Sequence, residues 1–408
     1  ASVERQARIL WKRGIPSRPW GNHRVFGLDG LLHTALRLPF LEDAGAMISF
    51  ARLNLEHAFR SQFREDGSYG ELTLGYHQHM MDTYIHLFRL ARHFPEAGLT
   101  LSTGILLRAV DYMLHTLPGG INDTHAELRD RDHGAAWQTA REAVASLTGA
   151  KPPADRRPAR DIVYPDAGQV FLRSSWAPGA DFLAFDASVY SGAHAHPARL
   201  GLVFRSGGRL WLADPGSFDY EMSNPFAVYG RSTPAHCTLN LNGLNQGLGD
   251  ARLARSVVTD DTALLHGVYQ GGYWSGVYTW GFQHGLGQGT HGRHERIVLW
   301  IRGEYLLVFD GMMCDRGQTV EHVWQLAPVA GWEHDPAALS WTTRGETPGF
   351  HLRMVLPPAA VGMTVYEGSK DPLRGWFGEH AGGGFSPAPQ VVFRHPSDSM
   401  FHATLAMP

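Results

Sequence analysis

One stretch in the middle of the chain carries imidazole and carboxylate side chains inside otherwise apolar sequence. It holds His194 and His196, then Asp214, then His236. Imidazole nitrogens and carboxylate oxygens are ligands that Zn²⁺ prefers in proteins, and imidazole also transfers protons near neutral pH. The stretch therefore predicts a metal site or a histidine-rich catalytic surface.

The local sequence indicates how these side chains are positioned. His194 and His196 precede the apolar run 200–204, and side chains two residues apart in a strand project from the same face. A Ser-Gly-Gly turn at 206–208 predicts a hairpin, and its second strand, 209–213, ends at Asp214. His236 is expected to open a third strand over 238–242. Either three or more of the four side chains share one site, or they are structural histidines bonded to backbone groups.

Two other metal folds fail on spacing, and the cysteines suggest no further site. A cupin needs a Glu three or four residues beyond the His-x-His pair, where this chain has Pro197-Ala-Arg-Leu-Gly201. The His-x-His-x-Asp-His pattern of metallo-β-lactamases is also absent. Cys237 and Cys314 imply no disulfide framework. We predict that Cys237 is a small buried residue, because in a strand its side chain faces away from that of His236.

The overall composition excludes several classes of function. A length of 408 residues is enough for two domains, and a net charge of −3 gives no basic field for nucleic acid. No apolar run approaches the roughly 18 to 20 residues of a membrane span, and no signal peptide is visible. Because the chain begins with Ala, the compartment is not evident from its first residues.

The hydrophobic period changes from helical to strand-like along the chain. Apolar stripes predict helices over 47–59, 80–91, 105–117 and 135–147, connected as antiparallel hairpins. A Pro-rich, charged segment over 151–163 is typical of a linker. Alternating segments such as 182–190, 296–301, 305–310 and 390–393 then predict an antiparallel β-sandwich. The expected fold is α+β, with a helical domain over 1–150 and a sandwich over 164–408.

The helical part carries a second group of polar residues, at the entrances of helices. Asn22-His23-Arg24 precedes the first clear helix, and Asp66-Gly67, Glu71 and Tyr76-His77 lead into another. Taken singly, each is explained as a helix cap. An amide, an imidazole and a phenol together at such junctions indicate a functional site, because functional side chains commonly gather there.

With these motifs the chain resembles the heparinase II/III-like polysaccharide lyases and the related alginate and oligo-alginate lyases. The resemblance covers nearly the whole chain, with the motifs in the family's order: Asn22-His23, Asp66-Gly67 with Glu71 and Tyr76-His77, His194-x-His196, Asp214-Pro-Gly216 and Arg231-Ser-Thr-Pro-Ala-His236. It implies an α/α toroid, here incomplete, followed by an antiparallel β-sandwich. It further implies a cleft between them that binds an acidic polysaccharide.

The resemblance also implies the chemistry. Lyases of this kind cleave a 4-linked uronic acid by β-elimination, in which a base removes the C5 proton and an acid protonates the departing O4. By resemblance, Asn22 and His23 hold the carboxylate, while Tyr76 is the general acid and also a base on one face of the sugar. His194 is the other candidate base. The remaining candidates bind uronate or orient the acid and base, with an ordinary salt bridge or cap as the alternative for each: Arg24, Glu71, His77 and Arg231.

The resemblance divides the His-x-His pair. In zinc-containing members of the family, the residues matching His196, Asp214 and His236 are the ligands, and the residue matching His194 is catalytic. A zinc ion there would be structural, since it would join three segments rather than activate water.

Several features depart from the family pattern. Pro197-Ala198 stands where an acidic residue is common, and Cys237 where Asn is common. The helical part is about half of a closed toroid, so we expect a preceding segment or a partner chain to complete it, or else a naturally shortened domain. The resemblance implies a periplasmic or secreted protein.

Two rival functions remain at this stage. One is a zinc-stabilised carbohydrate-binding or regulatory protein without turnover, although such a protein has no need of Asn22, His23, Tyr76 and His194 together. The other is a zinc-dependent hydrolase, which would need an open coordination position. A Gly-rich loop over 270–292 with Trp274, Tyr278 and Trp280 would suit stacking on sugar rings, or simply packs against the sandwich.

Overall fold

The chain is represented by a computed structural model, which divides into two compact units. The structure describes residues 2–14, 21–117, 133–150, 152, 157–189, 194–216, 221, 223–247, 249–279, 282–284, 289–358, 360–378, 384–397 and 402–408. A helical unit comprises 1–72, 76–114 and 132–158, and a β-rich unit comprises 73–75, 115–131 and 159–408. The predicted linker over 151–163 lies partly outside the described residues, and the first strand begins at Ile162.

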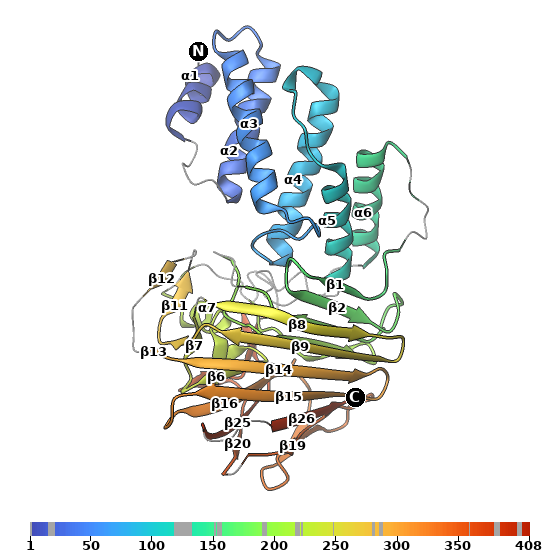
Figure 1. Ribbon diagram of the computed structural model, residues 1–408, viewed down its shortest axis with the longest axis vertical. Helices are drawn as coiled ribbons and strands as arrows, with labels where there is room; N and C mark the ends of the chain where they lie inside the picture. Colours follow the sequence, from blue (N-terminus) through green and yellow to red (C-terminus); the bar gives the residue numbers. More distant parts are fainter. Residues whose placement is uncertain are drawn as a thin grey trace. The chain divides into compact units, whose positions relative to one another are not determined.

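The helical unit is a series of helices that lie side by side in chain order (Figure 1). They are α1 (Ser2–Ile9), the π-helical η1 (Leu10–Gly14), α2 (Asn22–Arg37), α3 (Ala44–Gln62), α4 (Leu74–His93), the 3₁₀ turn η2 (Pro95–Ala97), α5 (Thr103–His115) and α6 (His133–Thr148). Alternate helices contact one another, as in an α/α toroid. The ring centroids of Phe26 in α2 and His79 in α4 lie 5.0 Å apart. The Arg89 Nε of α4 donates a hydrogen bond to the Ser146 hydroxyl of α6 at 2.8 Å.

Apolar side chains at helical spacing explain these helices. In α3, Met47, Ala51, Leu55 and Ala58 recur every three or four residues, and all are fully buried. The predicted helices over 47–59, 80–91, 105–117 and 135–147 correspond to α3, α4, α5 and α6, with differences of a few residues at their ends. The pattern of buried residues thus confirms the helical part of the fold class.

The loop that enters α4 requires glycine at position 67. Gly67 has φ +87°, and a Cβ there would lie 2.4 Å from the backbone carbon of Arg108 in α5. We expect Gly67→Ala to lower the free energy of unfolding by about 3 kcal/mol, since it adds a backbone clash to left-handed strain. Gly303→Ala is the matched control. Gly303 has φ +75° but open space around it, so strain alone should cost about 1 kcal/mol. Urea unfolding measures the free energy of unfolding of both variants. Equal losses of stability would contradict the predicted backbone clash at position 67.

The β-rich unit contains two facing layers and several short ribbons. Within the described residues, one layer is an eight-stranded sheet in the order β17 (Trp332–Asp335), β18 (Ser340–Thr343), β19 (His351–Leu356), β26 (His402–Met407), β15 (Tyr305–Cys314), β14 (Gly292–Ile301), β9 (Thr262–Gln270) and β8 (Asp250–Val258). Its neighbouring strands are antiparallel, and β26 lies between β19 and β15.

The second layer combines a five-stranded and a four-stranded antiparallel sheet. The first has the order β1 (Ile162–Tyr164), β2 (Gln169–Arg173), β3 (Phe182–Asp186), β4 (Gly201–Ser206) and β5 (Arg209–Leu212). The second has the order β20 (Gly362–Tyr366), β25 (Gln390–Pro396), β16 (Thr319–Gln325) and β6 (Leu239–Leu241). A bridge between Leu212 and Leu326 joins the two sheets.

Short elements connect the main strands. They are α7 (Pro225–Gly230), η4 (Thr233–Ala235), the ribbon of β13 (Gly289–Thr290), β10 (Tyr273–Trp274) and β7 (Asn245–Gln246), and the pairs β11 (Val277–Thr279) with β12 (Phe282–His284), β21 (Ser369–Lys370) with β22 (Leu373–Arg374), and β23 (Trp376–Gly378) with β24 (Phe385–Pro387).

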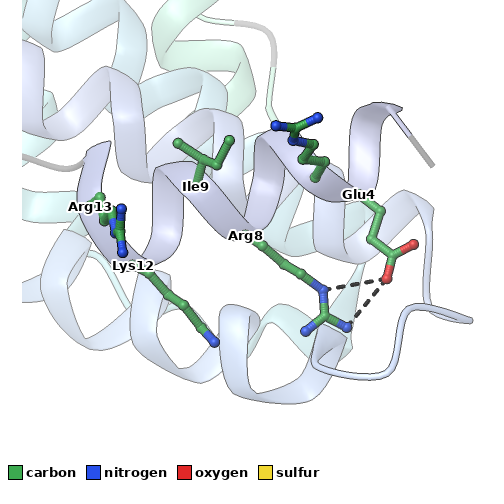
Figure 2. A pocket seen from close by; sticks show the side chains of 6 residues that line it. Glu4, Arg8, Ile9, Lys12 and Arg13 are labelled. Atoms are coloured by element: carbon green, nitrogen blue, oxygen red, sulfur yellow. Dashed lines mark hydrogen bonds and ion pairs between the residues drawn. The ribbon is translucent and has the colours of Figure 1, made fainter.

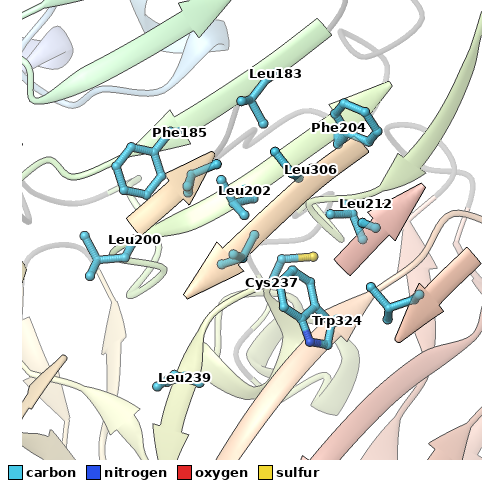
Figure 3. Close-up of a cluster of buried hydrophobic side chains, with 14 of the residues drawn as sticks. Leu183, Phe185, Leu200, Leu202, Phe204, Leu212, Cys237, Leu239, Leu306 and Trp324 are labelled. Carbon is cyan, nitrogen blue, oxygen red and sulfur yellow. The ribbon is translucent and has the colours of Figure 1, made fainter. Parts of the chain in front are cut away.

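The core lies between the two layers. Figure 3 shows side chains of β3 and β4, such as Leu183 and Phe204, in one cluster with Leu306 of β15 and Trp324 of β16. In β14 burial alternates along the strand, as expected for a strand with one face on the core. Helices followed by an antiparallel sandwich confirm the predicted fold class.

The predicted hairpin is present, but the segments that hold the histidines are not strands. Gly207 and Gly208 have φ +58° and +79°, the left-handed pair of a type I′ turn between β4 and β5. The prediction of an extended segment from His194 onward is wrong, because 194–200 is a loop and β4 begins at Gly201. Nor does His236 open a strand: it follows the 3₁₀ turn η4, and β6 begins at Leu239.

Candidate functional site

The first candidate residues form the N-terminus of α2. Asn22 is the first residue of this 16-residue helix, and its Oδ1 accepts a hydrogen bond from the backbone N–H of His23 at 2.9 Å. Asn22 is 9% exposed and His23 is exposed. The Arg24 guanidinium donates to Asn54 on α3. Because the first N–H groups of a helix and its dipole favour an anion, this terminus is suited to a carboxylate.

A second group surrounds the first turn of α4. Tyr76 is half-buried, while the next residue, His77, is fully buried. The His77 Nε2 lies 2.8 Å from the carbonyl oxygen of Ala109 on α5, and its ring lies 4.4 Å from that of Tyr112. His77 therefore fixes the start of α4 against α5, and its burial leaves Tyr76 as the accessible side chain of the pair.

The loop before α4 is organised by its own polar groups. Asp66 Oδ1 accepts from both the backbone N–H and the hydroxyl of Ser68, at 2.9 and 2.6 Å, as in an Asx turn. The Tyr69 hydroxyl donates to Glu71 at 3.4 Å, and Glu71 is 8% exposed. Burial and the Glu71 carboxylate both raise the pKa of the Tyr69 phenol well above its usual value. Asp66 thus shapes the turn, and Glu71 has a phenol as a partner.

The buried His77 ring predicts an acid-sensitive fold. Burial lowers its pKa to about 4, against the opposing effects of the Ala109 carbonyl and Asp66. The unfolded chain, with a His pKa near 6.5, binds more protons between these values, so stability falls as the pH falls through that window. We expect a loss of about 2 kcal/mol from this residue between pH 7 and pH 5. Urea unfolding at both pH values should show that the stability of His77→Gln depends less on pH than that of the wild type. An unchanged pH dependence would contradict the assignment of this effect to His77.

In the β-rich unit, three of the predicted residues converge. The Asp214 trio, defined as His196, Asp214 and His236, offers one ligand atom per residue, all within 4.8 Å of one another. His236 Nδ1 lies 3.2 Å from Asp214 Oδ2, and the rings of His196 and His236 lie 5.3 Å apart. None of the three residues is more than 3% exposed. They come from the loop before β4, the segment just after β5 and the turn after η4.

The Asp214 trio fits a zinc ion. Two imidazoles and one carboxylate are a common zinc donor set. The His236 Nε2 is buried and has no hydrogen-bond partner among the described residues, which is costly unless a cation binds there. Burial holds the pKa of His196 well below its usual value, and the nearby Arg199 and Arg231 add to this effect while Asp214 opposes it. The imidazole is therefore neutral at pH 7, as a metal ligand must be.

His194 is not part of the Asp214 trio. It is 4% exposed and two residues before His196, in a loop rather than a strand. In a loop, two residues at this spacing need not face the same way. The structure therefore allows one histidine to hold a metal while the other has a different role.

A buried arginine that the sequence analysis missed holds this loop. Arg199 donates to the carbonyl oxygen of His196 at 2.5 Å and to the Ser188 hydroxyl at 2.8 Å, and it pairs with Asp186 at 3.4 Å. Around it, Gln246 accepts from the Arg199 backbone N–H at 2.6 Å. The only sequence signal was a charged residue placed directly before an apolar strand.

A second buried arginine fixes the segments that carry two of the ligands. Arg296 of β14 donates to the carbonyl oxygens of Leu200 and Cys237, both at 2.7 Å, and is held by Asp310 of β15 at 2.7 and 3.0 Å. Leu200 ends the His196 loop, and Cys237 follows His236. Cys237 is itself buried, as predicted, and burial raises the pKa of its thiol to about 12.

Arg231 lies at the end of α7, directly after Gly230, and is 3% exposed. Its guanidinium is near enough to His196 to lower the pKa of that ring. Its burial is consistent with a role beside the Asp214 trio.

Two of the open hollows among the described residues contain no predicted catalytic residue. One, of about 540 Å³, is lined only by α1 and η1, including Arg8, Lys12 and Arg13 (Figure 2). The other, of about 570 Å³, is lined by Trp274, His291, Arg293 and neighbouring residues. Trp274 is half-buried, the side chain of Tyr278 is not described, and Trp280 lies outside the described residues.

Comparison with protein families found two matches. The family model described as heparinase II/III-like, C-terminal, matches residues 156–397, and the model of the heparinase II/III N-terminus matches residues 1–98. Comparison with curated proteins found no match. None of the described helices has both the length and the apolar character needed to cross a membrane.

Solved structures share the fold at low sequence identity. A mutant of the heparan sulfate lyase HepC from Pedobacter heparinus is 19% identical, with a TM-score of 0.75 over 99% of this chain and 62% of that chain. A structure of heparinase III is 16% identical, with a TM-score of 0.80 over 99% of this chain and 63% of that chain. The chain therefore spans somewhat less than two thirds of the length of these proteins.

Proposed function

The chain belongs to the heparinase II/III-like family, and from this premise we propose that it is a polysaccharide lyase acting on an acidic, uronate-containing glycan. The observation that carries the proposal is the pair of family matches, which fall on both structural units. The solved structures with this fold include a heparan sulfate lyase. A glycosaminoglycan is therefore the first substrate class to test, and alginate is the second.

The reaction that we propose is a β-elimination. A base takes the proton from C5 of the uronic acid, the C4–O4 bond breaks, O4 receives a proton, and a C4–C5 double bond forms. Negative charge builds up on the carboxylate as the C5 proton leaves, so groups that hold the carboxylate lower the barrier.

The N-terminus of α2 is suited to hold that carboxylate. Because Asn22 Oδ1 is occupied by the His23 backbone N–H, the side-chain amide of Asn22 presents its NH₂ as a donor. The exposed His23 imidazole and the positive end of the helix dipole add to this. We assign Arg24 to substrate binding as well, with its guanidinium oriented by Asn54.

Proton transfer is assigned to Tyr76 and His194. Tyr76 would protonate O4, since it is the accessible phenol at the start of α4. His194 would be the base, or Tyr76 would take both roles on one face of the sugar. We assign positioning roles to His77, which is fully buried, and to Glu71, which accepts from Tyr69. Arg231 would orient the residues beside His196.

Zinc in the Asp214 trio would be structural. A bound ion there would join the loop before β4, the segment just after β5 and the turn after η4, and would hold the His194 loop in place. Proton transfer would remain with the side chains. A periplasmic or secreted location, and a further segment or partner chain that completes the toroid, belong to the same proposal.

A direct assay tests the reaction. The protein is incubated with heparan sulfate, heparin, chondroitin, hyaluronan and alginate, and the ultraviolet absorbance of the unsaturated uronate is followed. We expect the chromophore with at least one of these polymers. Binding without the chromophore on every polymer would favour the non-catalytic alternative, and new reducing ends without unsaturation would indicate hydrolysis.

A further inference from the structure

A second group of buried histidines lies in the β-rich unit, away from the residues assigned to catalysis. The His402 trio, defined as His322 of β16, His395 of β25 and His402 of β26, also offers ligand atoms within 4.8 Å of one another. None of the three is more than 2% exposed. Neither the elimination chemistry nor the Asp214 trio accounts for them.

Strand register places the His402 trio between the two layers. In the β16–β25 ladder, His322 pairs with Phe393, so His395 projects from the same face as His322, together with the core residue Phe393. On the facing sheet, His402 pairs with Asp310 and is thus on the same face as that residue. The three imidazoles therefore meet in the interior, contributed by both layers.

The tautomer of one ring is set by its outer nitrogen. His395 Nδ1 lies 2.6 Å from the carbonyl oxygen of Pro396, so this nitrogen carries the proton. His322 Nδ1 lies 3.6 Å from Asp310 Oδ2, beyond hydrogen-bond distance, and has no hydrogen-bond partner among the described residues. The Nε2 atoms of His322 and His395 lie 3.1 Å apart. At this distance either one ring donates to the other or a cation binds beside the two nitrogens.

The third ring favours a bound cation. His402 is fully buried, and neither of its nitrogens has a hydrogen-bond partner among the described residues. Its ring lies 4.3 Å from that of His395 and 4.6 Å from that of His322. Buried polar atoms normally have partners, so a ring with two unpartnered nitrogens facing two other imidazoles indicates a missing ligand.

The carboxylate nearest to the trio is already engaged by other residues. The Asp310 charge is already balanced by Arg296, and His294 contacts the same carboxylate at 2.7 Å. Three buried imidazoles with ligand atoms this close together are a donor set suited to a divalent transition metal. Tetrahedral Zn²⁺ with Zn–N bonds of about 2.0–2.1 Å spaces its nitrogens about 3.3 Å apart, close to the separation of the two Nε2 atoms.

We propose that His322, His395 and His402 form a second metal site, for Zn²⁺ or another divalent transition metal that prefers imidazole. Asp310 lies beside His322 outside the coordination sphere, where carboxylates commonly occur near zinc-bound histidines. The site is independent of the proposed lyase activity. It would join β16 and β25 of one layer to β26 of the other.

Metal stoichiometry of the full chain tests the proposal. A third group, Asp29, His33 and His86, lies at the surface of the helical unit, with its ligand atoms also within 4.8 Å. We therefore use His86→Ala as the parent, so that this surface group does not contribute. The parent is stripped with a chelator, reloaded with Zn²⁺ or Co²⁺, and dialysed before metal analysis.

We expect the parent to retain two equivalents of metal. His402→Phe, which keeps a buried ring but removes both nitrogens, should retain one, as should His236→Ala, and the two together should retain none. A His402→Phe protein that still holds two equivalents would overturn the proposal. If His402→Phe does not fold, Co²⁺ titration of the parent decides. Binding of two equivalents of Co²⁺ with tetrahedral absorption bands supports the second site. Binding of a single equivalent, lost in the His236→Ala variant, overturns it.

Discussion

Tyr76→Phe is expected to reduce lyase turnover by about a hundredfold to ten-thousandfold while leaving the fold intact. The substitution removes only the phenolic hydroxyl, which in our proposal protonates O4 as the C4–O4 bond breaks. General acid catalysis typically contributes 10²- to 10⁴-fold, and the loss is larger if the same phenol is also the base. Because the proton is transferred in the transition state, kcat should fall much more than KM changes.

The same helix offers a matched control. Tyr84 also lies in α4, and it is fully buried. Its hydroxyl has no hydrogen-bond partner among the described residues, and its ring packs against Phe59 at 5.0 Å. Tyr84→Phe should therefore keep full activity and equal or greater stability. Rates come from the ultraviolet assay on the polymer that the wild type cleaves. Wild-type turnover by Tyr76→Phe would remove this residue from the mechanism.

The two neighbouring histidines, His194 and His196, should give opposite results when each is replaced by alanine. His194→Ala should lower turnover by about a hundredfold or more with metal content unchanged, because its ring transfers a proton and binds no ion. Since only a buried ring is lost, it should lose less stability than His196→Ala. His196→Ala should lose one equivalent of metal. It should also lose more than about 3 kcal/mol of stability, since the folded state loses a bound ion as well as a buried ring.

Metal analysis and thermal unfolding separate these two outcomes. A His194→Ala protein that loses metal as His196→Ala does would place both histidines in the metal site. A His194→Ala protein with normal turnover would leave Tyr76 as the only base. His236→Ala serves as the reference for metal loss, because its imidazole belongs to the Asp214 trio and lies on a different segment from both.

The sequence predicted the fold class because its two periodicities are strong. In α3 the stripe of Met47, Ala51 and Leu55 requires a buried helical face, and in β14 the alternation through Val298 and Trp300 requires a strand with one face on the core. The strands of the second layer were harder to delimit. β3 is buried along its whole length, so it shows no alternation that would mark its ends.

The proximity of His196, Asp214 and His236 could be predicted from the sequence, but their local structure could not. His196 lies in a loop and His236 follows a 3₁₀ turn, where strands were predicted. The loop depends on the buried pair of Arg199 and Asp186, which are distant contacts that no local pattern encodes. The His402 trio was missed for the same reason, since its rings are brought together only by strand pairing and by the packing of two sheets.

The position of β26 has a consequence for the order in which the molecule is made. β19 and β15 are not neighbours in the eight-stranded sheet, and among the described strands it is β26, residues 402–407, that lies between them. A ribosome must therefore translate almost all of the 408 residues before this sheet can be completed. The helices, whose contacts are closer in sequence, can form earlier during synthesis. Until β26 arrives, β15 and β19 each present an unpaired edge, the kind of surface that chaperones shield in nascent chains.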